Sequence, residues 1–299
     1  MEGHVRGSGV PPYPGVVTIA PRDRSTAPSD HPGMRPQTLM LTLLGEAVLG
    51  RDVAVYSGTF VKVMQRLDVS EEATRSTLTR MVARDLLARH RRGRKMYFGL
   101  TPRAIGVLAD GADRLWGQGA VNRDQQAGWT LLGFSLPESR RDERHQLRSR
   151  LRWAGFGPLR SGLWIAPGSV DVAAVLQDTH LLDHVQVFRA EPVGDVARIV
   201  SEAFDLTAIA ARYRDFLRRW RPPRPLPGAP DDLARQLWLV SDWLVVVRDD
   251  PRIPLRYLPT GWPAVAAERV FRRRHAAFRR KAEHTLAGLL DAIDVPPTR

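Results

Sequence analysis

A short basic segment, residues 75–95, constrains the fold more than any other part of the chain. It follows two amphipathic helical patterns and holds eight arginines and lysines but one acid, so its net charge is +7 in a chain of total charge +13. Only three of the 45 basic residues are lysines. A GC-rich genome would produce such an arginine bias, but it would spread the arginines evenly along the chain. Because the excess is concentrated in one segment instead, we interpret that segment as a surface for a polyanion.

Hydrophobic periodicity predicts three helices in and before this segment. Apolar residues at helical spacing indicate a first helix from about residue 35 and a second helix after Ser57. Ser70 is a suitable N-cap for a third helix that extends to about Arg84. Glu71 and Glu72 favour this start, since acidic side chains stabilise the positive end of the helix dipole.

Two strand patterns, residues 86–90 and 96–101, follow the third helix and enclose the basic sequence Arg91–Lys95. This order of helices, turn and hairpin is that of a winged helix-turn-helix, whose third helix enters the major groove of DNA. We expect the exposed face of the helix to meet base edges or flanking phosphates, and the hairpin tip to meet phosphates or the minor groove. The DNA-binding candidates are Arg75, Ser76, Thr79 and Arg80 on the helix, and Arg91, Arg92, Arg94 and Lys95 on the hairpin.

The rest of the chain divides into an alternating part and a helical part. Strands are predicted at residues 129–136, 159–166 and 184–191, with helices at 137–153 and 170–179. One further strand would complete a βαββαβ, ferredoxin-like domain. Helices are then predicted at residues 194–204, 207–220, 231–247 and 263–293.

The sequence therefore predicts an α+β, multidomain protein. The expected parts are a disordered tail (1–34), a winged-helix DNA-binding domain (35–118), a ferredoxin-like central domain (128–193) and a helical C-terminal domain for dimerisation or effector binding (194–299). The tail is rich in Pro, Gly and Ser, and the natural start is either Met1 or Met34. Since no run of about 18 apolar residues occurs, we expect a cytoplasmic protein without a membrane partner.

The composition and the missing motifs also exclude several kinds of chemical site. A chain without cysteine has no disulfide framework, thiolate metal site or cysteine nucleophile. Common nucleotide-binding, metalloprotease and hydrolase motifs are missing too, so we expect no enzyme activity, no metal and no cofactor. Two alternatives stay open: a non-sequence-specific, nucleoid-type DNA-binding protein, and a metal-dependent nuclease whose central domain places Glu138 after its first strand.

Four arginines recur at four-residue spacing on the predicted central helix, and like charges at this spacing repel each other. Either they form a hydrated face near Asp142 and Glu143, or they bind an anion such as a DNA flank, an acidic dimer surface or the phosphates of a CoA-type effector. Trp262 lies in a proline-framed loop where a pocket could open. The arginines are Arg140, Arg144, Arg148 and Arg152, and the speculative effector-binding set is Arg140, Arg144, Arg148 and Trp262.

Three separated blocks of sequence are distinctive. They are residues 73–81 with 93–97, residues 129–138 with 151–157, and residues 250–254 with 258–263. In this order, across residues 35–290, they resemble the PaaX family, bacterial repressors of phenylacetic acid degradation. The chain departs from the family pattern at Asp85 and Ala264, where glycine is usual.

The resemblance implies a winged helix, a central domain similar to a small CRISPR-associated endonuclease, and a helical C-terminal domain. It also implies a dimeric repressor that is relieved by an aryl-CoA thioester. We therefore expect a sequence-specific transcriptional regulator whose partners are a double-stranded DNA operator, a second copy of the chain, and an acyl-CoA or other anionic small-molecule effector.

Overall fold

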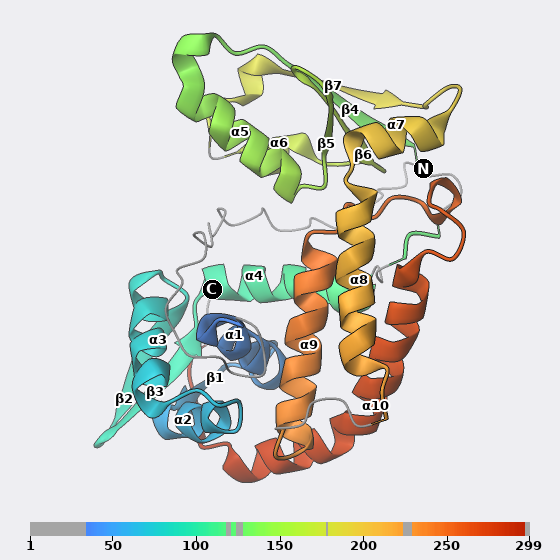
Figure 1. The fold of residues 1–299 in the computed structure, drawn as a ribbon. Helices are drawn as coiled ribbons and strands as arrows, with labels where there is room; N and C mark the ends of the chain where they lie inside the picture. Colours follow the sequence, from blue (N-terminus) through green and yellow to red (C-terminus); the bar gives the residue numbers. More distant parts are fainter. Residues whose placement is uncertain (1–33, 118–120, 124–127, 178, 224–228, 297–299) are drawn as a thin grey trace, which may run out of the picture.

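The structure is a computed structural model that describes residues 34–117, 121–123, 128–177, 179–223 and 229–296 (Figure 1). All of the predicted tail except Met34 lies outside these ranges. The fold is mixed α and β, with two four-stranded antiparallel sheets that lie in different parts of the chain. Among the described residues, no helix is both long enough and apolar enough to cross a membrane.

The N-terminal unit contains the predicted helices and hairpin in the predicted order. It also contains a strand that was not predicted, β1, because four residues carry too little alternation to identify a strand. Its elements are α1 (Pro36–Ala47), β1 (Val53–Tyr56), α2 (Ser57–Gln65), α3 (Glu71–Ala83), β2 (Leu87–Arg92), β3 (Lys95–Leu100) and α4 (Pro102–Ala112), which continues as a π-helical turn to Gly117.

The sheet of this unit has the strand order β2-β3-β1-β8. Strand β8 (Ala292–Asp294) comes from the other end of the chain, and it pairs antiparallel with β1. The prediction of a continuous helix to residue 293 is therefore wrong, since the last helix ends at Leu289. Backbone hydrogen bonds from Tyr56 to Asp291 and from Val295 to Asp52 hold the extended segment in place.

The central domain is a ferredoxin-like βαββαβ unit. Its elements are β4 (Trp129–Phe134), α5 (Arg141–Trp153), β5 (Gly157–Arg160), β6 (Leu163–Pro167), α6 (Val172–Leu176) and β7 (Val185–Ala190), and the strand order is β5-β6-β4-β7. The single strand predicted at residues 159–166 is in fact a hairpin. Gly162 adopts φ +78° in its turn, a conformation that favours glycine. This division supplies the strand that the sequence pattern lacked.

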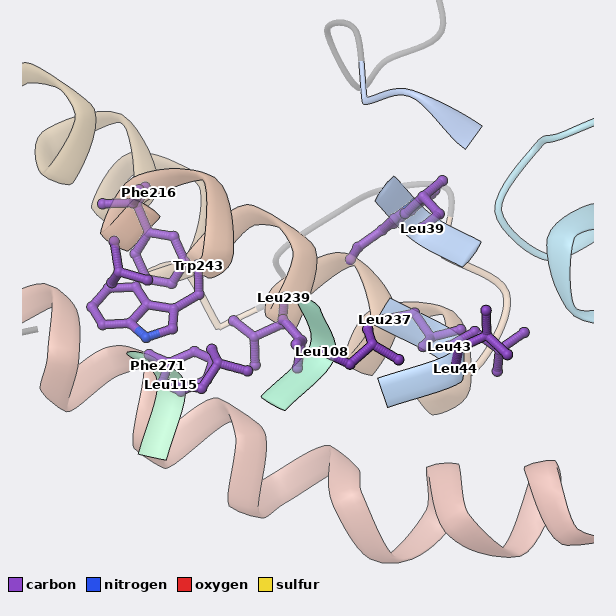
Figure 2. Close-up of a cluster of buried hydrophobic side chains, with 14 of the residues drawn as sticks. Leu39, Leu43, Leu44, Leu108, Leu115, Phe216, Leu237, Leu239, Trp243 and Phe271 are labelled. Carbon is purple, nitrogen blue, oxygen red and sulfur yellow. The ribbon is translucent and has the colours of Figure 1, made fainter. Parts of the chain in front are cut away.

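Four helices complete the chain: α7 (Val196–Ala203), α8 (Leu206–Trp220), α9 (Asp232–Arg248) and α10 (Pro263–Leu289). Trp243 of α9 stacks on Phe271 of α10, with ring centroids 4.8 Å apart. The same buried cluster includes Leu43 of α1 and Leu237 of α9 (Figure 2), so the N-terminal unit and the C-terminal helices share one core. Because burial of one large apolar side chain contributes about 1.5–3 kcal/mol, separating the two units would be costly.

Candidate nucleic-acid interface

Helix α3 begins where the sequence predicts, and side-chain hydrogen bonds hold its N-terminus and its buried face. Asp68 adopts φ +58° in the preceding turn, and the Ser70 hydroxyl caps the helix by accepting a hydrogen bond from the Ala73 amide at 3.2 Å. Thr74 and Thr77 are fully buried, but their hydroxyls donate to backbone carbonyls one turn earlier. The buried polar groups are thus satisfied, and the opposite face is left to solvent.

That opposite face carries the four predicted helix residues, all exposed: Arg75, Ser76, Thr79 and Arg80. Arg80 is oriented by two hydroxyls, since its guanidinium donates to Ser76 Oγ at 3.1 Å and to Thr77 Oγ1 at 2.9 Å. Arg75 instead pairs with Glu71 at 2.7 Å on the surface. Exposed pairs of this kind contribute little to stability, so an incoming phosphate can replace the carboxylate at low cost.

The wing is tighter than the sequence predicts. Arg92 pairs directly with Lys95, which limits the turn to Gly93 and Arg94. Gly93 adopts φ +60°, as the first central residue of a two-residue hairpin turn commonly does. The expected five-residue basic tip is therefore corrected to a single cation, Arg94, in the turn. Arg91, Arg92 and Lys95 belong to the strands, where the pairing register fixes their direction.

The register divides the wing cations between two faces. Arg89 lies opposite Phe98, which packs edge-on against Phe60 of α2, so the Arg89 side chain lies on the helix side of the sheet. Arg91 follows two residues later on the same side. Arg92 and Lys95 lie on the other side. Arg89 contributes to the charge of the basic segment, but the sequence analysis does not name it as a DNA-binding candidate. Strand alternation from Leu87 could have placed it on the helix side of the sheet.

Lys95 has an internal partner. Its ammonium donates to Asp291 Oδ2 at 2.8 Å, and the Tyr97 hydroxyl donates to Asp291 Oδ1 at 3.2 Å. The Lys95 nitrogen also lies 4.9 Å from the centre of the Tyr56 ring. The hydrogen bond between Lys95 and Asp291 raises the pKa of Lys95 and lowers the pKa of Asp291, so both groups are charged at neutral pH.

The four central arginines do not form one helical row. Arg140 precedes α5, in a 3-10 turn at Glu138–Arg140, where it contacts His184 and Glu143. Arg144 donates to the Leu136 carbonyl at 2.6 Å. A small cavity of about 330 Å³ is lined by Arg148, Arg152, Arg160 and Trp164, and the Arg152 guanidinium lies 5.7 Å from the centre of the Trp164 ring.

Trp262 does not lie in an open loop. Its side chain is 8% exposed, it belongs to the large hydrophobic core, and it occupies the N-cap position of α10. It lines neither this small cavity nor the larger cleft between the central domain and the helices. The structure therefore does not bring Trp262 together with Arg140, Arg144 and Arg148 in a common pocket.

A cleft of about 1740 Å³ separates the central domain from the helical part of the chain. Its wall includes the end of α5, the segment 155–158, the start of α8 and the segment 248–252. Trp153 is 42% exposed here, and the Arg114 guanidinium lies 5.3 Å from the centre of its ring. Asp250 is partly buried and accepts a hydrogen bond from Tyr213, and desolvation raises the pKa of both groups. The sequence pattern predicted none of this arrangement.

The described residues contain no group of three His, Asp or Glu side chains that could hold a metal ion. Glu138, the carboxylate weighed for a nuclease, is exposed in the turn that precedes α5.

Family models match the chain in three consecutive parts. The PaaX-like protein model matches residues 35–104, the PaaX protein central Cas2-like domain matches residues 122–199, and the PaaX-like protein C-terminal domain matches residues 204–288. The chain belongs to the PaaX family of transcriptional regulators. The family resemblance inferred from the sequence blocks is therefore confirmed, and so is the expected combination of an N-terminal unit, a ferredoxin-like domain and a C-terminal domain.

A solved structure shares the fold of this PaaX protein. The uncharacterized protein Rv0674 from Mycobacterium tuberculosis superposes with a TM-score of 0.59 at 19% identity, covering 84% of this chain and 98% of that one. Comparison with curated proteins found no match.

Proposed function

We propose that this PaaX-family protein is a sequence-specific DNA-binding regulator that acts as a homodimer on a pseudo-palindromic operator. The observation that carries the proposal is the geometry of α3 and the wing: a capped helix presents Arg75, Ser76, Thr79 and Arg80 outward, and Arg89 and Arg91 lie on the helix side of the hairpin. An arginine guanidinium can donate two hydrogen bonds to a guanine edge or to a phosphate. Serine and threonine hydroxyls can form hydrogen bonds with the edges of several bases. Binding of this kind to a promoter would repress transcription.

The nucleoid-type alternative shares the electrostatics but not the selectivity. Either protein would lose affinity steeply as salt rises, because phosphate contacts release counterions. A regulator should bind its own sites on the order of a thousandfold or more tightly than random duplex. Arg80 favours the regulator, since a guanidinium oriented by Ser76 and Thr77 suits fixed readout better than diffuse attraction.

Competition binding decides between the two. Fragments from the gene's own neighbourhood and random duplex of equal length are titrated against the full chain at several salt concentrations. We expect selected fragments to outcompete random duplex at every salt concentration. Equal affinities would reject sequence-specific regulation, and cleavage of DNA or RNA with magnesium or manganese would support the nuclease instead.

We also propose that an anionic effector, such as an acyl-CoA, binds outside the wing and lowers operator affinity. The interdomain cleft suits such a ligand better than the set of Arg140, Arg144, Arg148 and Trp262, because Trp262 is buried. In the cleft, the partly exposed Trp153 offers an aromatic surface beside the Arg114 guanidinium. A 5- to 150-fold change in operator affinity corresponds to about 1–3 kcal/mol of coupling.

Calorimetric titration of CoA thioesters locates the site. Trp153→Ala should weaken binding severalfold, whereas Arg144→Ala with Arg148→Ala should leave it unchanged. The reverse result would favour the arginine set. If no thioester or free acid binds the wild-type chain, the effector proposal is rejected.

A further inference from the structure

The edges of the two sheets differ in how well they are protected. Unpaired strand edges invite pairing with another chain, and proteins usually block them with charge, proline, irregularity, short length or a covering element. Strand β2 carries Arg89, Arg91 and Arg92, and strand β8 is only three residues long. Strand β5 contains Pro158, has an irregular register there, and lies beneath α7. Each of these three edges has a recognisable block.

The fourth edge, strand β7, is the least protected among the described residues, since it carries a single charge, Arg189, and no proline. The strand runs for six residues, and its central residues, Val187 and Phe188, are 44% and 53% exposed. Leu182 and Val193, on either side of the strand, are 38% and 89% exposed. Four of the seven exposed large hydrophobic side chains found in the described chain thus lie within residues 182–193, which we name the β7 edge segment.

The two central side chains of β7 lie on opposite faces of the sheet. Val187 pairs with Leu132, which points into the core beneath α5 and α6, whereas Phe188 pairs with Leu131 on the other face. A helix that docked on one face would cover only one of them. A strand added to the edge would continue the sheet and cover both, while its backbone paired with the free edge groups.

A second copy of the chain is the occupant that the charges favour. The β7 edge segment contains Asp183, Glu191 and Arg189, so its net charge is −1 with His184 neutral, in a chain of net charge +13. Two copies can approach at this segment without the repulsion expected between basic surfaces. An antiparallel edge is also self-complementary about a two-fold axis perpendicular to the sheet, which is the symmetry of the commonest dimers.

We propose that β7 pairs antiparallel with β7 of a second copy, so that the two central domains form one continuous eight-stranded sheet. Leu182 and Val193 then lie beside the joined strands. The inference deepens the homodimer of the proposed function by naming its surface, and the dimer surface can be tested without DNA.

Sedimentation of the full chain tests the pairing. Phe188→Lys places a charge on the edge at a position exposed enough to tolerate it, and Val245→Lys on α9 is the matched control, since Val245 is also an exposed apolar residue at 39%. We expect a dimer for the wild type and the control and at least a tenfold higher dissociation constant for Phe188→Lys. A wild-type monomer, or an unchanged dimer in Phe188→Lys, would overturn the proposal. If the wild type is a monomer, a protein of different sequence would have to cover the β7 edge.

Crosslinking supplies a second readout because the chain has no cysteine. Opposed residues in antiparallel strands have Cα atoms about 4.5–5.5 Å apart, within the range that a disulfide spans. Val187→Cys or Phe188→Cys, whichever lies nearer the two-fold axis, should give a covalent dimer when an oxidant is added, and Val245→Cys should not. If neither the Val187→Cys nor the Phe188→Cys variant forms a crosslink, β7 pairing is overturned. Loss of operator selectivity with an intact β7 dimer would reject the proposed function and leave this inference standing.

Discussion

Lys95 and Asp291 lie 196 positions apart in sequence, yet their charged groups meet at 2.8 Å. The contact joins the wing to the C-terminal end of the chain, where β8 extends the wing's own sheet through β1. Asp291 is held from two further sides: its amide donates to Thr59 Oγ1, and its carbonyl accepts from the Tyr56 amide. A movement of α10 would therefore be transmitted to the wing through β8 and β1, and through the contact between Asp291 and Lys95.

The first prediction follows from this pair. Asp291→Asn removes a negative charge beside Lys95 and leaves the ammonium free for a phosphate, so affinity for any DNA should rise severalfold. The dependence of log affinity on log salt should steepen by about one unit, as expected for roughly one additional phosphate contact. Fluorescence anisotropy titrations at several salt concentrations measure both effects.

Asp294→Asn is the matched control, because Asp294 is exposed at the end of β8, three residues after Asp291, and its substitution removes the same charge. It should change the affinity less and leave the slope near that of the wild type. Equal effects from the two variants would mean that only the total charge matters and that the contact with Lys95 is irrelevant.

A second prediction concerns base readout by α3. Arg80→Ala should lose about 1–3 kcal/mol on the operator and relax the base preference at one position. Ser76→Ala should lose less, because it removes only one of the two hydroxyls that orient the Arg80 guanidinium. Binding to operators with single base substitutions distinguishes the two variants. An Arg80→Ala chain that binds like the wild type would show that Arg80 does not face a base.

Helix α3 and the contact between Lys95 and Asp291 differ in how far the sequence alone could predict them. The α3 helix could be predicted because its signals are local: the cap at Ser70, the acidic first turn and the apolar spacing all lie within fourteen residues. The contact with Asp291 could not be predicted, since β1 and β8 are too short to show alternation and each is extended only because the other pairs with it. Secondary structure that depends on such a distant partner leaves almost no local trace.

Arginine spacing gave an incomplete prediction for a different reason. The four-residue repeat from Arg140 to Arg152 is real, but Arg140 adopts φ −98° and ψ +49°, outside the helical region. Pro137 precedes a 3-10 turn there, and the regular helix begins one residue after Arg140. Spacing alone predicts a shared face only where the backbone is helical throughout.

The third prediction uses the two faces of the wing. Arg91→Ala removes a cation on the side of α3, whereas Arg92→Ala removes one on the side of Asp291. The Arg91 variant should therefore weaken DNA binding more, although both lose one arginine from adjacent positions. Anisotropy with one random duplex measures the difference. A larger loss for Arg92→Ala would show that the face shared with Lys95, and not the α3 side, makes the main contact with DNA.

The last prediction concerns His275, which is buried on α10 against Trp116 and Phe271. Its Nε2 atom has no hydrogen-bond partner within the described structure. Burial, followed by the charge of Arg279, lowers the pKa of the imidazole, although Glu283 acts in the opposite direction. The folded state therefore favours the neutral ring, and the unfolded state binds the proton more readily.

The stability that comes from the neutral ring is fully present above the unfolded pKa of about 6.5 and is lost as the pH falls below it, at about 1.4 kcal/mol per unit of pKa difference.

We expect the free energy of unfolding in urea to fall less between pH 7.5 and pH 5.5 in His275→Phe than in the wild type. His284→Phe, at an exposed position of the same helix, should keep the wild-type slope. Asp250 acts in the opposite direction, since desolvation raises its pKa, but it is common to all three chains and cancels in the comparison. Parallel pH profiles for His275→Phe and the wild type would contradict the assignment of this pH dependence to His275.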